Sequence, residues 1–144
     1  MDDLSSLTGV TGRREFAVEP RHATSVFGEQ ADPPALPAAL ASPDEVVEVL
    51  GTPFLLSFCE FVGRESLRGH LPEGTGTVGE RADVRHRRAA TVGTTVVVET
   101  DVVDVDGTRV ELTATVSRAT DEGTVGTATL VFRVVDRERF RASL

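Results

Sequence analysis

The chain has 144 residues, of which 15 are basic and 23 acidic, giving a formal net charge of −8 at pH 7. This length is typical of one domain, which can bury a hydrophobic core without disulfides or structural metal. The single cysteine, Cys59, excludes an intramolecular disulfide and a cysteine cluster for zinc or iron–sulfur. The acidic balance disfavours nucleic acids and anionic membranes as partners.

The amino terminus favours a cytoplasmic protein. Its first residues, Met1 to Leu4, lack the basic and then apolar pattern of a signal peptide. No apolar stretch approaches the roughly 20 residues that a helix needs to cross a bilayer. We therefore expect neither secretion nor a membrane span.

The first third of the chain predicts one strand followed by a long loop. Residues Arg13 to Val18 are expected to form a short strand that ends before Pro20. The tract from Gln30 to Pro43 contains four prolines and five alanines. Because proline fixes φ and removes a hydrogen-bond donor, we expect this tract to be an extended surface loop or lid.

Two helices are predicted next. The stretch 42–50 begins with a hydroxyl residue, a proline and two acids, which predicts a short helix ending near Leu50. Thr52 then has the residue type of a helix cap, which predicts a second, central helix over residues 53–68. The middle of this second helix is apolar nearly all round, a pattern that favours a helix surrounded by protein.

From residue 77 onward, apolar residues repeat with a period of two, which is typical of half-buried strands. Asp106-Gly107 is a strong hairpin signal, and the segment 121–123 is a second turn signal. Four strands are therefore predicted before an arginine-rich polar tail, over residues 77–87, 94–105, 108–119 and 124–135. In the third, one face is expected to be buried and to carry Val110, Leu112, Ala114 and Val116.

This order of elements predicts an α+β fold and a single domain over residues 1–144. A strand, a buried helix and four consecutive antiparallel strands correspond to the hot-dog fold, in which a curved antiparallel sheet wraps around a long central helix. Such a sheet covers only part of its helix and leaves its edge open, and a second copy usually closes both. We therefore expect a homodimer.

Two residues are the strongest candidates for chemistry. Glu60 stands inside the apolar stretch of the central helix, where an ionised carboxylate is costly unless it lines a wet pocket or pairs with a cation. Alternatively, Glu60 lies on an exposed stripe with Ser57 and Arg64, which share its helix face. His86 stands in a predicted strand, where its imidazole could donate a proton near neutral pH, and the alternative is an ordinary surface or core histidine.

Several other positions have a structural and a functional interpretation. Thr52 is explained as a helix cap, although a hydroxyl at a helix start also suits a carbonyl oxygen or carboxylate. Gly79 is an isolated glycine in a strand, which indicates a bulge or the close approach of a ligand. The run 85–88, Arg-His-Arg-Arg, is interpreted as a local anion site, such as one for a cofactor phosphate, or as a solvated strand edge. Cys59 is interpreted as a small apolar residue of the core. His22 and His70 stand in loop-like segments and are weaker candidates for chemistry than His86.

Together these residues resemble a known family, the hot-dog thioesterases of the fluoroacetyl-CoA thioesterase type. The resemblance extends loosely from about Arg13 to Phe140 and is carried by the segments 52–60, 71–79 and 84–93. Members of the family have a threonine, a glutamate eight positions later, and a downstream glycine and histidine seven apart. The same spacings occur here at Thr52, Glu60, Gly79 and His86.

The resemblance implies hydrolysis of a short-chain acyl-CoA to the free acid and CoA, at a dimer interface and without metal or any cofactor beyond the CoA of the substrate. Glu60 is then the nucleophile or general base, His86 stabilises and protonates the leaving thiolate, and Thr52 orients Glu60 or the substrate. The expected substrate-binding residues are Gly79, through its backbone N–H, with Phe54 and Arg88.

Two departures from the family concern the substrate. Fluoroacetyl-specific members carry a histidine and an arginine shortly after a Gly-Thr pair in the last strand, whereas Gly126-Thr127 is followed here by Ala128. The tract 30–43 is also longer than the usual connection. Fluoroacetyl specificity is therefore not assigned. The alternative to an enzyme is a non-catalytic hot-dog protein whose cleft only holds an acyl or CoA group.

Overall fold

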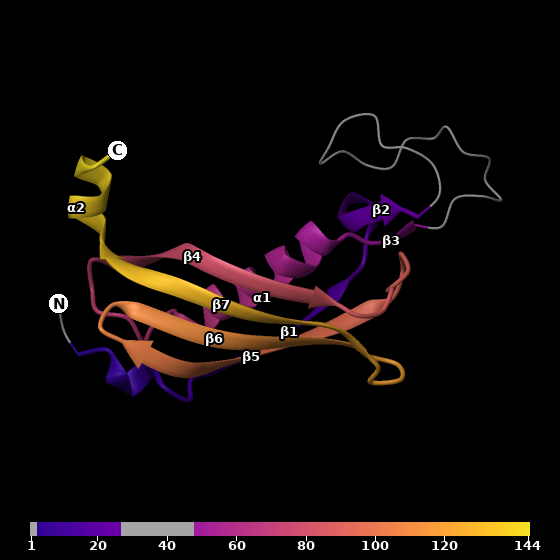
Figure 1. Ribbon diagram of the computed structural model, residues 1–144, viewed down its shortest axis with the longest axis horizontal. Helices are drawn as coiled ribbons and strands as arrows, with labels where there is room; N and C mark the ends of the chain where they lie inside the picture. The colour runs from indigo at the N-terminus through magenta and orange to yellow at the C-terminus, as the bar shows by residue number, and fades with distance from the viewer. Residues whose placement is uncertain (1–2, 27–47) are drawn as a thin grey trace.

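The computed structural model describes residues 3–26 and 48–144 of the chain (Figure 1). Its main elements are a five-stranded sheet and one long helix, α1 (Thr52–Leu67), that packs against one face of this sheet. The strands of the sheet are β1 (Thr11–Ala17), β4 (Thr75–His86), β5 (Thr95–Asp106), β6 (Arg109–Arg118) and β7 (Thr124–Asp136). The smaller elements are the 3₁₀ turns η1 (Ser5–Leu7) and η2 (Pro20–His22), the strand pair β2 (Ala23–Ser25) and β3 (Glu48–Leu50), and helix α2 (Arg137–Ala142).

The large sheet is antiparallel throughout, with the strand order β1-β5-β6-β7-β4. The turn between β5 and β6 contains Gly107 with a φ of 60°, a conformation that glycine adopts without strain, so the predicted hairpin is confirmed. The order leaves β1 and β4 at the two edges. Strand β4 therefore has β7 on one side and no strand of the described residues on the other.

The core lies between α1 and the inner face of the sheet. Gly63 allows the helix to approach the sheet closely, because a Cβ at this position would lie 3.3 Å from atoms of Leu112 and Phe132. Leu55, Cys59 and Val62 of the helix are buried, and so are alternate residues of β6. The predicted alternation along β6 is confirmed, since its buried residues are Val110, Leu112, Ala114 and Val116. One long helix packed on an antiparallel sheet is the predicted α+β, hot-dog arrangement.

Helix α1 is buried on one face only within the single chain, as expected of a sheet that covers only part of its helix. Phe61 is 47% exposed, and Phe54 and Leu56 are half-buried. The five strands cover the inner face of the helix, and Phe16 of β1 covers one flank by stacking on Phe58 with ring centroids 4.4 Å apart. The outer face of α1 has no such cover in the described residues.

The short helix predicted to end near Leu50 is also wrong at its carboxyl end. Residues Glu48–Leu50 form strand β3, which pairs with β2 so that Leu50 lies opposite Ala23. The Leu50 N–H donates to the carbonyl of Ala90 at 2.8 Å. These non-local hydrogen bonds outweigh the local helix signal. The rest of that predicted helix and the Pro/Ala tract 30–43 lie outside the described residues.

The ends of two helices differ from expectation. Gly51, not Thr52, occupies the N-cap position of α1, and its N–H donates to the carbonyl of His22 at 2.8 Å. Thr52 is the first helical residue, so its hydroxyl is not a cap. At the other end of the chain, the predicted polar tail forms α2, because the Asp136 side chain accepts a hydrogen bond from the Arg139 N–H.

Candidate functional site

Thr52 and His86 meet where the first turn of α1 lies against the end of β4. The Thr52 Oγ1 atom is 2.9 Å from Nδ1 of His86. Because Gly51 takes the N-cap position, the threonine hydroxyl is available for this contact. The other ring nitrogen of His86, Nε2, is buried and has no hydrogen-bond partner within the described residues. A buried polar atom without a partner is uncommon in proteins, which marks this imidazole as available to another group.

Glu60 and Gly79 meet farther along the same two elements. A Cβ placed on Gly79 would lie 3.3 Å from Oε1 of Glu60, so the glycine lets the carboxylate approach the strand. The register of β4 against β7 shifts between Gly79 and Arg81, which confirms the bulge interpretation of this glycine. Glycine at the bulge therefore serves both the strand geometry and the space beside Glu60.

Glu60 borders two hollows on the surface. One, of about 370 Å³, lies on the outer face of α1 and contains Ser57 and Arg64. The other, of about 320 Å³, lies toward β4 and contains Gly79 and Arg81. Glu60 itself is half-buried and forms no hydrogen bond or ion pair with any described residue. Glu60 thus borders a pocket on one side and the exposed helix stripe on the other, so each of the two interpretations describes one side of this residue. The ion pair between Glu60 and Arg64 on this stripe does not form.

Within one chain, the structure does not bring Glu60 to His86. Eight residues of helix separate Thr52 from Glu60, about 12 Å along the axis. Seven residues of strand separate Gly79 from His86, roughly 23 Å if fully extended. The candidate residues therefore form two half-sites, Thr52 with His86 and Glu60 with Gly79.

The two other expected substrate-binding residues lie near the Thr52 and His86 half-site. Phe54 is half-buried, and its ring lies 5.8 Å from that of His22. Arg88 is exposed just beyond β4, and its N–H donates to the carbonyl of Val125 at 3.1 Å. The Gly123 N–H lowers the pKa of Asp121, with smaller contributions from the positive charges of Arg118 and Arg88.

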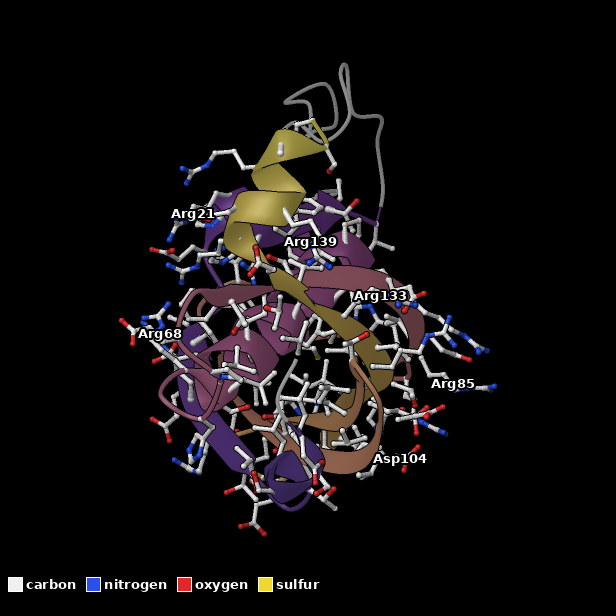
Figure 2. The ribbon with its side chains drawn as sticks, turned by 90° about the vertical axis from the view of Figure 1, so that its left-hand side faces the viewer. Arg21, Arg68, Arg85, Asp104, Arg133 and Arg139 are labelled. Atoms are coloured by element: carbon white, nitrogen blue, oxygen red, sulfur yellow. The ribbon has the colours of Figure 1, made fainter. Side chains whose placement is uncertain are left out.

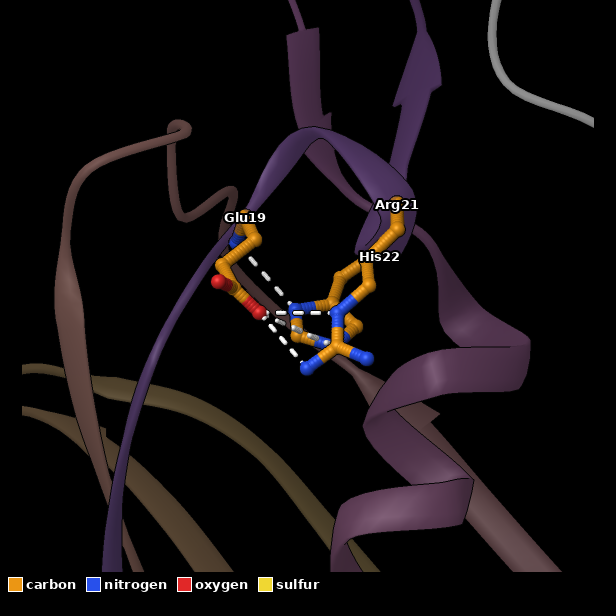
Figure 3. Close-up of polar contacts among 3 residues, drawn as sticks. All are labelled: Glu19, Arg21 and His22. Atoms are coloured by element: carbon orange, nitrogen blue, oxygen red, sulfur yellow. Dashed lines mark hydrogen bonds and ion pairs between the residues drawn. The ribbon is translucent and has the colours of Figure 1, made fainter.

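His22 is a structural residue whose importance sequence reasoning missed. It accepts a hydrogen bond at Nδ1 from the Glu19 N–H at 3.1 Å, and the Glu19 carboxylate in turn binds Arg21 at 2.8 Å (Figure 3). The ring packs edge-on against Phe58 with centroids 4.9 Å apart. Burial, and then the charge of Arg21, lower the pKa of His22. The backbone carbonyl of His22 accepts a hydrogen bond from the Gly51 N–H, and its ring packs on Phe58 of the helix. Both contacts fix His22 to the first half of α1.

The outer face of the sheet has a different charge arrangement. Glu80 accepts hydrogen bonds from Arg133 and Arg109, each at 3.0 Å, and these bonds lower the pKa of its carboxyl. They join β4, β6 and β7 on the side away from α1. Figure 2 shows Arg133 and Arg85 on the same side of the molecule, opposite Arg68.

The described residues give no sign of a metal centre or of a membrane span. Among them, no three His, Cys, Asp or Glu side chains are grouped as metal ligands would be. No helix within these residues has the length and apolar character to cross a bilayer. Cys59 is buried in α1, and burial raises the pKa of its thiol to about 12, which agrees with its interpretation as a core residue.

Comparisons with known proteins identify the family of this chain. A family model described as fluoroacetyl-CoA-specific thioesterase, FlK, matches residues 37–138, which is more than half of the chain. No curated protein sequence matches the chain.

Three solved structures illustrate the similarity of fold. A thioesterase superfamily member from Thermus thermophilus is 19% identical with a TM-score of 0.77, covering 99% of this chain and 91% of that one. A hot-dog-like protein from Thermanaerovibrio acidaminovorans is 22% identical with a TM-score of 0.78, covering 99% and 94%. A threonine-to-serine variant of FlK in complex with acetyl-CoA is 25% identical with a TM-score of 0.73, covering 94% of each chain.

Proposed function

Because this chain belongs to the fluoroacetyl-CoA-specific thioesterase family and is an acyl-CoA thioesterase, we propose that it hydrolyses short-chain acyl-CoAs at a site shared by two copies of the chain. The observation that carries this proposal is the pair of incomplete half-sites. One has a buried imidazole nitrogen without a partner, and the other has a half-buried carboxylate without a partner, both within the described residues. Thioester hydrolysis needs both groups at one carbonyl.

A homodimer formed through β4 would bring the half-sites together. Strand β4 is an edge, and unpaired strand edges are normally covered. In an antiparallel pair related by a two-fold axis, residues at equal distances from the axis lie opposite each other. In the register of β4 against β7, Gly79 lies opposite Phe132 and His86 opposite Gly126, so with the bulge counted the midpoint between Gly79 and His86 falls at Asp83. An axis there places Gly79 and Glu60 of one protomer beside His86 of the other.

In the proposed site, Glu60 either attacks the thioester carbonyl carbon or takes a proton from the attacking water. If Glu60 attacks, its new C–O bond forms as the C–S bond breaks, and water then hydrolyses the resulting mixed anhydride to the free acid and restores Glu60. If water attacks instead, its oxygen forms the new C–O bond as the C–S bond breaks. Either route yields the free acid and CoA. The backbone N–H of Gly79 stabilises the negative charge that develops on the carbonyl oxygen. The Nε2–H of His86 of the other protomer donates a hydrogen bond to the leaving thiolate and stabilises its charge, and the proton released by water converts the thiolate to the free thiol.

Thr52 has a defined role in this scheme. When its hydroxyl donates to Nδ1 of His86, the neutral imidazole carries its proton on Nε2, which is the nitrogen that has no partner in the described residues. The threonine therefore sets the tautomer in which the Nε2–H of His86 can donate a hydrogen bond to the leaving thiolate. Phe54 and Arg88 lie near this half-site and are proposed to contact the substrate.

The close packing beside His86 supports the proposal that the acyl group is short. His86 lies opposite Gly126 of β7, and a Cβ on Gly126 would lie 2.9 Å from a methyl carbon of Leu55. Leu55 therefore already fills the inner side of the sheet at this position. The need for CoA as part of the substrate supports a cytoplasmic location.

Release of free thiol from acyl-CoAs of increasing chain length tests the proposal. We expect turnover to be fastest with the shortest acyl groups, and to be strongly reduced by His86→Ala. Mixing inactive Glu60→Gln and His86→Ala protomers tests the shared site, because a mixed dimer retains one intact pair of half-sites. Recovery of part of the activity in the mixture is expected. Activity in the His86→Ala protein equal to wild type, or no recovery on mixing, would contradict the shared site.

A further inference from the structure

The outer face of α1 carries a hollow that the proposed chemistry does not use. It has a volume of about 370 Å³ and begins at Glu60. From there it follows the exposed face of the helix toward its carboxyl end. Its lining consists of Ser57, Glu60, Phe61, Arg64, Glu65 and Arg68.

Two arginines in this hollow have no partner in the part of the chain that the structure describes. Arg64 and Arg68 stand one helical turn apart, and neither guanidinium group forms a hydrogen bond or ion pair with a described residue. The acid of the same hollow, Glu65, is already bound at 3.2 Å by Arg14 of β1. Two unpaired guanidinium groups therefore line the same hollow in a chain whose net charge is −8.

The same hollow has an apolar wall. Phe61 is 47% exposed, and the guanidinium carbon of Arg14 lies 5.0 Å from its ring centroid, which holds the ring in place from one side. An exposed aromatic ring next to two free arginines suits a ligand that has both an organic part and negative groups. Arginine recognises phosphate oxygens well, because its planar fork can form two parallel hydrogen bonds.

We propose that Arg64 and Arg68 bind phosphate groups of the CoA portion of the substrate, with Phe61 contacting the organic part. This inference rests on the proposed function, because it takes Glu60 as the point where the thioester lies. Arg68 is eight residues beyond Glu60, about 12 Å along the helix axis, and its side chain extends farther. A CoA thioester has its reactive carbonyl at one end and its phosphates at the other, joined by an extended pantetheine arm, so one molecule can span both places.

Arg68 and Arg85 are separate cationic positions. They lie on opposite sides of the molecule in Figure 2. The run Arg85–Arg88 lies at the far end of β4 from Gly79, whereas Arg64 and Arg68 continue the helix that carries Glu60. Arg64 and Arg68 line one hollow together with the Glu60 carboxylate.

Steady-state kinetics on two matched substrates test the phosphate site. The substrates are an acyl-CoA and the corresponding acyl-pantetheine, which has the same thioester but no phosphates. The double variant Arg64→Gln/Arg68→Gln is expected to raise KM for acyl-CoA about tenfold or more with kcat unchanged, since losing charge-assisted bonds weakens binding by this order. KM for acyl-pantetheine should stay at the wild-type value.

A charge-matched control separates local binding from a change in net charge. Arg139→Gln/Arg141→Gln removes the same two charges from α2, and its KM for acyl-CoA is expected to equal that of wild type. Arg64→Lys/Arg68→Lys should restore part of the affinity, because it keeps the charge but not the fork. Thermal unfolding of each variant verifies that α1 is intact.

The outcomes distinguish this inference from the proposed function. Equal KM values for acyl-CoA in wild type and the double glutamine variant would overturn the phosphate site and leave the proposed function standing. A parallel rise in KM for both substrates would also overturn it, by indicating a general change in the helix. Absence of turnover with every thioester would contradict the proposed function alone, because calorimetric titration with CoA and with pantetheine measures the phosphate contacts without any reaction.

Discussion

The two sides of the β4 bulge treat their glutamates differently. On the outer side, Glu80 is held by Arg109 and Arg133 at 3.0 Å each, and the pKa of its carboxyl is lowered by these hydrogen bonds. On the inner side, Glu60 lies against Gly79 and has no polar partner among the described residues. Both carboxylates border the same hollow, but Glu80 is exposed and paired, whereas Glu60 is half-buried and unpaired among these residues. The outer one joins strands, and the inner one is left for a ligand.

The sharpest test of this contrast exchanges each glutamate for its amide. Glu60→Gln is expected to lower kcat by about a thousandfold or more, because the amide can neither attack the carbonyl nor accept a proton from water. Glu80→Gln is the matched control on the other side of the strand and should keep wild-type kcat. Thiol release from a short acyl-CoA measures both. Similar losses in the two variants would remove the distinction between the two sides.

A second test concerns the hydrogen bond between Thr52 and His86. Thr52→Val keeps the shape of the side chain but removes the donor, so we expect kcat to fall by about tenfold or more. Thr52→Ser keeps the hydroxyl and should retain most of the activity. Because Thr52 is not the cap of α1, neither variant should change the melting temperature by more than a few degrees. An active valine variant would contradict the role of this hydroxyl.

A third test compares how the buried His22 and the exposed His70 affect the dependence of the melting temperature on pH. Burial lowers the pKa of His22 below its ordinary value of 6.5, so the unfolded chain binds more protons than the folded one as pH falls through this range. The stability that neutral His22 contributes is present above pH 6.5 and is lost as pH falls toward the lower folded pKa. We expect the melting temperature of wild type to drop between pH 7.5 and 5.5 by about 2–4 °C more than that of His22→Gln.

The exposed His70 supplies the control for this measurement. His70→Gln should show the same dependence of melting temperature on pH as wild type. An identical dependence in wild type and His22→Gln would contradict the assignment of the effect to His22.

The smallest expected effect is that of Glu80→Gln on stability. Its pKa is lowered in the folded chain by the bonds from Arg133 and Arg109, so its contribution is present above the ordinary carboxyl pKa of 4.5 and is lost as pH falls through the folded pKa. Because the group is at the surface, we expect only a slight decrease in melting temperature at pH 7. Wild type and variant should become equal near pH 3, or in high salt. A difference that persists under both conditions would indicate a packing effect instead.

Sequence patterns predicted the sheet better than the connections. The period-two pattern and the Asp106-Gly107 turn predict β5 to β7, because alternation follows directly from one buried face. The pattern failed at Glu48–Leu50, where pairing with Ala23–Ser25 outweighs the local helix signal. The apolar pattern of α1 also does not tell which of its faces the sheet covers, because that depends on the whole fold.

For the candidate site, sequence spacing identified residues but not their grouping. The contact of Thr52 with His86 depends on how β4 lies against α1, which no local pattern encodes. His22 was underestimated because its burial arises from Phe54 and Phe58, more than thirty positions away. The unpaired state of Arg64 also depends on a long-range contact, since Glu65 of the same helix binds Arg14 of β1.

The buried thiol of Cys59 has a practical consequence. It is the only cysteine of the chain, its side chain is fully buried, and burial raises its pKa to about 12. A disulfide reagent that detects CoA as it is released will therefore meet no competing sulfhydryl on the folded enzyme. The same reagent reacts with Cys59 once the protein unfolds, so one chromogenic assay measures both CoA release and unfolding.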